Sequence, residues 1–241
     1  MIIDFHSHIN KNPKTGEYEE EELLKDMEQN QIDIRVVSTL EGRSTKDINN
    51  YISDFVSRHE NKLIGFANIN PKEYNCAEET KRALQLKGIY GVEFNSFEHG
   101  YFPDNCESLI KILDIVNYYN VPVKVFTGIG AMSMPQQWAI YAKKYPNINF
   151  IMLHMGCFDF GYSCVDLALK YENIFVETSN QYEAQILRKA FNNLPENKII
   201  FGTQYPNKFT KNSIDLFDIF ELSDEFLEKI YYQNAKNILD I

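Results

Sequence analysis

The chain has 241 residues, 44% of them hydrophobic, with 17 Phe and 15 Tyr, so it is long and apolar enough to bury a sizeable core. Its net charge of −10 predicts no nucleic-acid partner, because phosphate binding needs a basic footprint. No apolar stretch is long enough to cross a membrane and none resembles a signal peptide, which predicts a cytoplasmic protein without a membrane partner.

Eight short apolar segments of strand length alternate with segments of helical periodicity. The predicted strands cover residues 2–8, 33–39, 63–69, 89–95, 121–127, 149–155, 174–179 and 199–204. Helices are predicted over 19–30, over 105–120 and, as a pair whose N-cap is Ser223, near the end of the chain. No change of composition and no Gly/Ser linker divides the series, so we expect one domain over residues 1–241.

This alternation predicts a single α/β domain with the closed (β/α)8 TIM barrel architecture. An open doubly wound sheet is the main alternative, and it would need a glycine-rich phosphate-binding turn after the first strand. The segment "HSHINKNPKTG" that follows the first predicted strand has no such turn. In a barrel, the functional residues lie at the carboxyl ends of the strands.

The first predicted strand ends in two histidines, in "IIDFHSHIN" at residues 2–10. Side chains two positions apart share one face of a strand, so His6 and His8 project together, with Asp4 on the same face. Two imidazoles can share a divalent cation, but zinc usually takes three or four protein ligands. The pair alone therefore fits either part of a metal site or two incidental histidines. Further polar residues end the later strands, and these are Asn95, Thr127, His154, Ser179 and Gln204.

Five segments, in order, resemble motifs of one known family. They are "IIDFHSHI", "NINFIMLHMG", "NIFVETSN", "IIFGTQYP" and "IYYQNAKNIL". They are similar to the first-strand I-D-x-H-x-H, the sixth-strand H-x-G, the seventh strand, the eighth-strand G-T-D-Y-P and the closing helix of the amidohydrolase superfamily. The resemblance is to its amidohydrolase-related branch, which includes aminocarboxymuconate semialdehyde decarboxylase, and it spans nearly the whole chain.

The resemblance implies a metal-dependent enzyme. His6 and His8 would be metal ligands, a fifth-strand histidine and an eighth-strand aspartate would complete the site, and His154 would polarise the substrate or move protons. The implied activity is that of a hydrolase, or a non-oxidative decarboxylase, that acts on a small carbonyl or carboxylate substrate through a metal-activated water. The implied cofactor is a divalent metal, with zinc expected, and relatives in this branch often form homodimers.

The chain departs from the family pattern at two of the four expected ligands. "PVKVFTG" places Phe126 where the family has its fifth-strand histidine, and "GTQYP" places Gln204 where it has the aspartate. Phenylalanine cannot bind a metal. Glutamine can offer a carbonyl oxygen, so Gln204 remains a candidate site residue, but it cannot accept a proton as a base.

Two interpretations of the altered site remain open. Glu93, on the fourth predicted strand, could join His6 and His8 as a metal ligand in a set of two histidines and one carboxylate. Alternatively, Lys124 could pair with Glu93 or Asp4 inside the barrel and supply part of the positive charge of a lost metal. Asn95, Ser179, Phe126 and Lys124 are expected to line or border the pocket.

Two functions of different classes follow from these interpretations. The first is the metal-dependent hydrolase or decarboxylase, motivated by His6, His8 and His154. The second is a catalytically degenerate barrel that binds a ligand or a protein partner, motivated by Phe126 and Gln204. Metal content separates the two, and the identity of the substrate is beyond the sequence.

Overall fold

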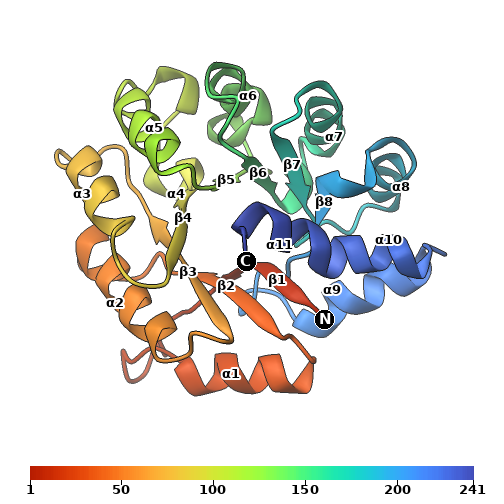
Figure 1. Cartoon of the computed structure of the whole chain (residues 1–241), viewed down its shortest axis with the longest axis horizontal. Helices are drawn as coiled ribbons and strands as arrows, with labels where there is room; N and C mark the ends of the chain where they lie inside the picture. Colours follow the sequence, from red (N-terminus) through yellow and green to blue (C-terminus); the bar gives the residue numbers. More distant parts are fainter.

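The computed structural model describes residues 1–241, and these form eight parallel strands surrounded by helices (Figure 1). The strands are hydrogen-bonded in sequence order, β1 to β8. They are β1 (Ile3–His8), β2 (Ile34–Ser38), β3 (Leu63–Asn68), β4 (Ile89–Phe94), β5 (Val123–Phe126), β6 (Phe150–Leu153), β7 (Ile174–Glu177) and β8 (Ile199–Ile200). Every predicted strand is present, and the (β/α)8 TIM barrel prediction is confirmed.

Helices follow the strands, and most of them lie around the outside of the barrel. They are α1 (Glu20–Gln29), α2 (Thr45–Ser57), α3 (Cys76–Ala83), α4 (Ser96–His99), α5 (Ser108–Tyr119), α6 (Pro135–Lys144), α7 (Gly161–Lys170), α8 (Ala184–Asn193), α9 (Thr210–Asp215), α10 (Asp224–Glu228) and α11 (Asn234–Leu239). The predicted N-cap of the terminal pair is present, because the Ser223 side chain accepts a hydrogen bond from the backbone N–H of Phe226. A π-helical turn, Lys229–Gln233, joins α10 to α11.

The barrel closes between β1 and the segment that continues β8. The backbone N–H of Phe5 donates to the carbonyl of Phe201 at 3.0 Å, and that of His8 donates to the carbonyl of Tyr205 at 2.7 Å. Closure leaves no open strand edge, and it brings residues from both ends of the chain to the same mouth of the barrel. Gln204 therefore lies next to His6, whose carbonyl accepts the backbone N–H of Gln204 at 2.8 Å.

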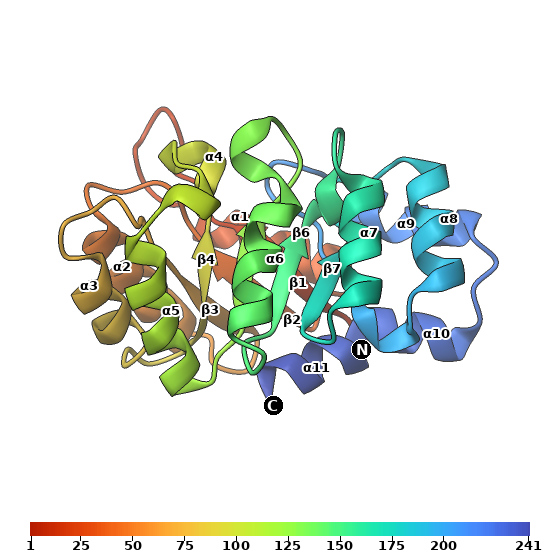
Figure 2. The same cartoon turned by 90° about the horizontal axis from the view of Figure 1, so that it is seen from above.

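Apolar side chains form two separate layers. The larger layer fills the space between the strands and the outer helices. The smaller one fills the barrel interior, where Ile3, Phe5 and Phe66 pack with Ile238 and Leu239 of α11. Figure 2 shows α11 at one end of the barrel and α4 with several connecting loops at the other. With α11 closing the amino-terminal end, the carboxyl ends of the strands form the open mouth.

An irregularity in β1 changes one expectation from the sequence. The pairing of β1 with β2 shifts register between Asp4 and Ser7, so the strict alternation of faces is broken. Ile3 and Phe5 belong to the interior cluster, yet His6, the very next residue, faces the mouth cavity. Asp4 therefore does not lie below the histidines, as the regular alternation predicted, and is instead bonded to Arg35, with Nε 2.9 Å from Oδ2.

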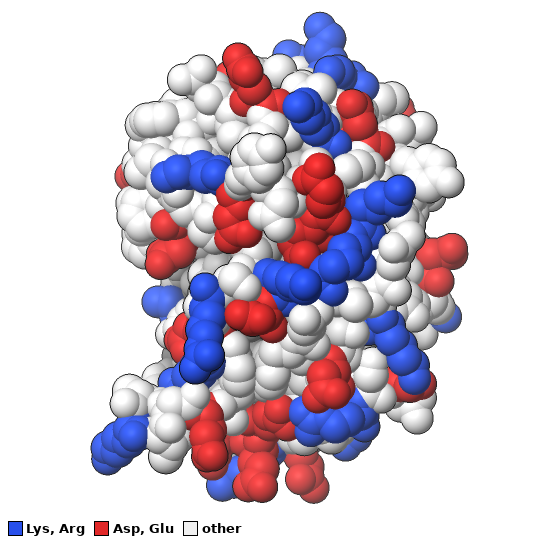
Figure 3. All heavy atoms as spheres, turned by 90° about the vertical axis from the view of Figure 1, so that its left-hand side faces the viewer, with Lys and Arg blue, Asp and Glu red and all other residues white.

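The molecular surface carries charges of both signs. On the face that includes α2 and α3, Lys and Arg side chains alternate with Asp and Glu side chains rather than forming a patch of one sign (Figure 3). None of the helices combines the length and the apolar composition that a membrane crossing would require.

Candidate metal centre and active site

A cavity of about 240 Å³ opens at the carboxyl ends of the strands. Its walls are formed by His6, His8, Leu40, Glu93, Asn95, Phe97, Glu98, Phe126, Leu153, His154, Gln204 and Asn207. The sequence-predicted site residues thus come together around one space, except for Lys124 and Ser179. Both of those are fully buried behind the cavity wall, where they contact residues that line it.

Three side chains of types that can bind a metal converge in this cavity. His6 and His8, from the end of β1, and Glu93, from β4, each offer a ligand atom, and these atoms all lie within 4.8 Å of one another. All three residues are buried. Two imidazoles and one carboxylate form a recognised donor set for a divalent metal, with positions left open for water or substrate.

The two oxygens of Glu93 have different partners. Oε2 accepts a hydrogen bond from the Ser38 hydroxyl at 2.6 Å and pairs with the Lys124 ammonium at 2.7 Å. Oε1 lies 2.8 Å from Nε2 of His8. Lys124 reaches Glu93 because the two are register partners on β4 and β5. Of the two partners considered for Lys124, the structure has Glu93, since Asp4 is bonded to Arg35.

The buried charged and titratable groups of this cluster shift one another's pKa values. Burial alone would raise the pKa of Glu93, but the Lys124 ammonium and the two imidazoles outweigh it and hold that pKa well below the ordinary value of 4.5. Burial, together with the Lys124 ammonium, lowers the pKa of His6 well below 6.5. Glu93 is therefore ionised and His6 is neutral at neutral pH, which are the forms that bind metals.

Two orphaned polar atoms support the fit of a cation. Nε2 of His6 and Oε1 of Gln204 are buried without a hydrogen-bond partner, although both residues line the cavity. A buried polar atom without a partner is costly, and an imidazole nitrogen and an amide oxygen are both atom types that can bind a cation. Because Lys124 pairs with Oε2 of Glu93, Oε1 is left on the side of His8. The residues present therefore fit a divalent metal without displacement of Lys124.

Phe126 forms an aromatic wall where the family has its fifth-strand histidine. Its ring packs edge-on against His154, with centroids 5.4 Å apart, and lies 5.9 Å from the ring of Phe97. A phenyl ring in place of a histidine removes one potential metal ligand and adds apolar surface beside the imidazole of His154.

His154 is held at the end of β6 in an unusual backbone conformation. Its φ of 62° lies in the left-handed region, which residues other than glycine seldom adopt. Nδ1 of its imidazole lies 2.8 Å from the Ser179 hydroxyl, and the ring lines the cavity. Burial, with the neighbouring His8 as the next cause, lowers the pKa of His154 to about 3, so the ring is neutral at neutral pH.

Glu177 was not predicted as a site residue. It is fully buried on β7, where its carboxylate accepts the backbone N–H groups of His154 at 3.0 Å and Ser179 at 2.6 Å. Burial raises its pKa to about 7, although these hydrogen bonds act in the opposite direction. The only sequence signal was one acidic residue in an otherwise apolar strand, "NIFVETS". A single strand does not reveal which backbone the carboxylate contacts.

The raised pKa of Glu177 predicts a specific pH dependence of stability. Between its ordinary value of 4.5 and about 7, the folded protein binds more protons at this group than the unfolded chain does. The stabilisation that comes from proton binding by Glu177 is therefore fully present below pH 4.5 and is lost as the pH rises through about 7. We expect the free energy of unfolding of the wild type, minus that of Glu177→Gln, to fall over this range. Urea unfolding at several pH values measures the difference, and a difference that stays flat or rises with pH contradicts the prediction.

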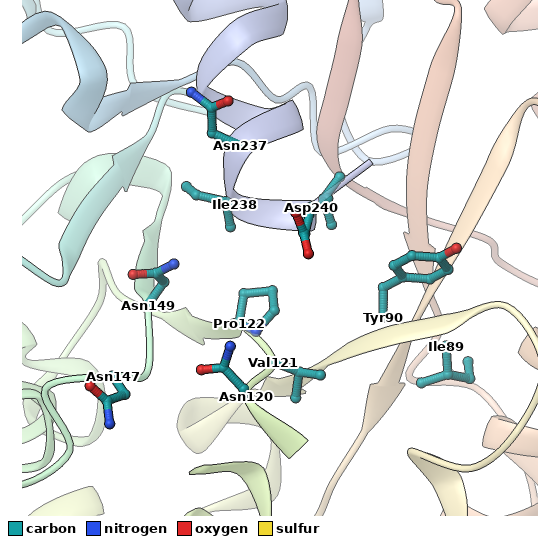
Figure 4. A pocket seen from close by; sticks show the side chains of 11 residues that line it. Ile89, Tyr90, Asn120, Val121, Pro122, Asn147, Asn149, Asn237, Ile238 and Asp240 are labelled. Carbon is teal, nitrogen blue, oxygen red and sulfur yellow. The ribbon is translucent and has the colours of Figure 1, made fainter. Parts of the chain in front are cut away.

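A second pocket lies at the opposite end of the barrel (Figure 4). Its volume is about 340 Å³, and four asparagines, Asn120, Asn147, Asn149 and Asn237, line it together with Asp240 and apolar side chains. No histidine, cysteine, lysine or arginine is among its lining residues. Of these two pockets, only the mouth cavity is lined by histidines.

The structure is a (β/α)8 barrel, a known class of enzyme scaffold, with a candidate metal-binding donor set at its carboxyl mouth. The sequence profile of the amidohydrolase family matches residues 3–241, so the chain belongs to the amidohydrolase family. The resemblance inferred from five sequence segments is confirmed.

Some proteins that are similar to the chain in sequence or in fold are named as decarboxylases. It is 21% identical to the gamma-resorcylate decarboxylase of Polaromonas sp. JS666 over 259 residues, which cover 85% of this chain and 78% of that protein. The 5-carboxyvanillate decarboxylase of Sphingomonas paucimobilis has the same fold, with a TM-score of 0.80, 11% identity and coverage of 100% of this chain and 99% of that chain. A dihydroxybenzoic acid decarboxylase of Polaromonas sp. JS666, solved with manganese and 2-nitroresorcinol, gives a TM-score of 0.77, with 17% identity and coverage of 99% and 96%.

Proposed function

We propose that this protein is a metal-dependent, non-oxidative decarboxylase of a small aromatic carboxylic acid. The observation that carries the proposal is the buried donor set of His6, His8 and Glu93, which lies in the same cavity as His154. Names of the relatives support the reaction class, since they are decarboxylases and one was solved with manganese.

Decarboxylation suits this site better than hydrolysis does. In the family an aspartate on the eighth strand is the usual base that takes a proton from the attacking water, and Gln204, which stands in its place, cannot do so. Glu93 is already engaged by Ser38, Lys124 and His8. Loss of CO₂ needs no attacking water. It needs only a place for the electron pair and a proton for the carbon.

The cavity favours an anionic substrate only when a cation is bound. Neither lysine nor arginine lines it, so no protein cation is available to a substrate carboxylate. A divalent cation on His6, His8 and Glu93 would supply that positive charge and stabilise the negative charge that develops on the substrate. The amides of Asn95 and Asn207 can donate hydrogen bonds to the same group.

The shape of the cavity indicates a small, flat substrate. Its volume of about 240 Å³ lies below the range of roughly 300–1,000 Å³ that is usual for sites of drug-sized ligands. Phe126 and Phe97 present ring surface on one side, which suits an aromatic ring. We therefore propose a monocyclic hydroxybenzoic acid, in which a hydroxyl group stands next to the carboxylate.

His154 can move the single proton that this reaction requires. The neutral imidazole takes the proton of the substrate hydroxyl and returns it to the ring carbon that carries the carboxylate. The bond between that carbon and the carboxylate then breaks, CO₂ leaves, and the electron pair restores the aromatic ring. The product leaves as a phenolate, which takes a proton from water, and His154 is neutral again.

Metal content and CO₂ release test the proposal together. The purified full-length protein is assayed for bound zinc and manganese, and then for CO₂ release from 2,6-dihydroxybenzoate after reconstitution with each metal. We expect about one divalent metal per chain and release of CO₂ that a chelator abolishes. A protein that binds neither metal, even when it is added in excess, contradicts the proposal and favours the catalytically degenerate barrel.

Three narrower expectations belong to the same proposal. We propose zinc as the cation, because two of the three donors are imidazoles, with manganese as the alternative that the carboxylate and the relative suggest. We also propose a homodimer and a cytoplasmic location. Metal analysis, light scattering and cell fractionation test the three expectations in turn.

Replacement of Gln204 by aspartate is expected to raise metal affinity. The change adds a negative charge where Oε1 of Gln204 is buried without a partner, on the wall of the same cavity. Calorimetric titration with zinc should give a dissociation constant at least about tenfold lower than that of the wild type. New hydrolytic turnover on simple esters or lactones would show that the glutamine suppresses hydrolysis. Unchanged or weaker metal affinity in the variant contradicts a metal site at this position.

A further inference from the structure

Three residues behind the cavity wall form one hydrogen-bonded chain. The Ser179 hydroxyl lies 2.7 Å from Oε2 of Glu177 and 2.8 Å from Nδ1 of His154. All three side chains are buried, so no bulk water competes for these bonds. The same Glu177 oxygen also accepts the backbone N–H of His154 at 3.0 Å. One carboxylate therefore contacts the main chain of His154 directly and its imidazole through Ser179.

The donors around Glu177 determine where the proton of Ser179 points. The carboxylate receives two backbone N–H groups and the hydroxyl, and it has no other side-chain partner. A serine hydroxyl has one proton, and a carboxylate is a stronger acceptor than a neutral imidazole nitrogen. The Ser179 proton therefore goes to Glu177, and the Ser179 oxygen is left to accept.

A lone pair on Ser179 then requires a proton on Nδ1 of His154. In a neutral imidazole only one nitrogen carries hydrogen, and its bonding partner selects which one. We infer that Glu177 and Ser179 are positioning residues that hold His154 in the Nδ1–H tautomer, with the lone pair of Nε2 directed to the cavity. The catalytic consequence rests on the proposed function: His154 begins the cycle as a base, ready to take the hydroxyl proton.

Space for this carboxylate exists only because residue 202 is glycine. A Cβ atom at Gly202 would overlap the Glu177 carboxylate. The glycine of the eighth-strand segment "FGTQ" thus makes room for the chain of three residues. His154 itself has the left-handed φ of 62°, and the N–H of this strained residue is the one that Glu177 accepts. The space at Gly202 for the Glu177 carboxylate and the left-handed backbone of His154 thus both concern the residue that carries the imidazole. This combination supports a functional arrangement rather than incidental packing.

Nitrogen NMR of the histidines tests the inference without any turnover. The full-length protein is labelled with ¹⁵N-histidine, and His154→Asn identifies the His154 signals among those of the five histidines. Spectra are recorded without metal and with zinc, at about pH 8, above the pKa of Glu177. We expect Nδ1 of His154 to give the signal of a protonated nitrogen and Nε2 that of an unprotonated one.

Two variants and a rescue make the test specific. In Glu177→Met, the Ser179 hydroxyl is free to donate to Nδ1, so the proton of His154 should move to Nε2. In Ser179→Ala, Nδ1 loses its acceptor and the preference for Nδ1–H should be lost, whereas Ser179→Thr keeps a hydroxyl and should retain it. If Glu177→Met fails to fold, the His154 tautomer in Ser179→Ala is sufficient to test the inference.

The inference is overturned by either of two results. One is a wild-type His154 that carries its proton on Nε2, and the other is a Ser179→Ala variant in which Nδ1–H remains as populated as in the wild type. Failure of the proposed function looks different. An Nδ1–H tautomer in a protein that releases no CO₂ keeps the inference about positioning and rejects the decarboxylase.

Discussion

Replacing Glu93 with glutamine should abolish tight metal binding and lower the free energy of unfolding by about 3–5 kcal/mol. Glu93 is the only carboxylate of the donor set and the only ion-pair partner of Lys124, which is completely buried. The variant removes the charged ligand from the cation and leaves an ammonium group without a counterion inside the barrel. Elemental analysis measures the first effect, and urea unfolding of the metal-free protein measures the second.

Lys124→Met supplies the matched control for this prediction. The single variant should still bind metal, because Lys124 pairs with Oε2 of Glu93, whereas Oε1 lies near His8. The double variant, Glu93→Gln with Lys124→Met, should regain most of the lost stability, since removal of both charges costs much less than removal of one. Its metal content should stay low. Wild-type metal content in Glu93→Gln would rule out the ligand role, and loss of metal in Lys124→Met alone would show that the lysine does more than pair with Glu93.

Replacing His154 with asparagine should lower kcat for CO₂ release by about 10²–10⁴-fold, the usual contribution of a positioned general acid or base. Metal content and KM should change little, because His154 lies outside the donor set and its proposed contribution is made in the transition state. Steady-state kinetics of the zinc- or manganese-loaded variant separate the two constants. The neutral form of His154 at working pH, which follows from its pKa of about 3, is what allows it to accept a proton first.

Met155→Leu is a suitable control for the His154 variant. Met155 is the next residue in the same turn, is equally buried, and packs in the outer apolar layer rather than on the cavity wall. Similar volume and polarity should leave kcat near the wild-type value. Comparable losses in both variants would point to disturbance of the turn, and an unimpaired His154→Asn variant would remove His154 from the proton path.

Patterns within short segments of the sequence were enough to predict the barrel and several residues of the candidate site. Strand-length apolar segments and helical stripes depend on neighbouring residues only, so the eight strands and the buried face of α5 are readable from the chain. The position of His6 and His8 at a strand end, and the replacement of the family's histidine and aspartate by Phe126 and Gln204, are also properties of short segments. Family resemblance then identified which strand ends matter.

Contacts between distant segments decided the rest. The alternation rule placed Asp4 with the histidines, but the register shift in β1 directs it to Arg35, and such a shift depends on the pairing of two strands. Whether Lys124 pairs with Glu93 or Asp4 depended on the register of β4 with β5. The division of the Glu93 oxygens between Lys124 and His8 is likewise a matter of atomic positions.

The sequence by itself determined the fold, the family and the candidate metal-binding residues, because those follow from periodicity and motif order. Only the tertiary structure showed that Lys124 contacts one oxygen of Glu93 and His8 the other, and that Glu177 reaches His154 through Ser179. The physical reason is the closed barrel. It brings eight strand ends to one mouth, so the partners of each side chain come from neighbouring strands rather than from neighbouring residues.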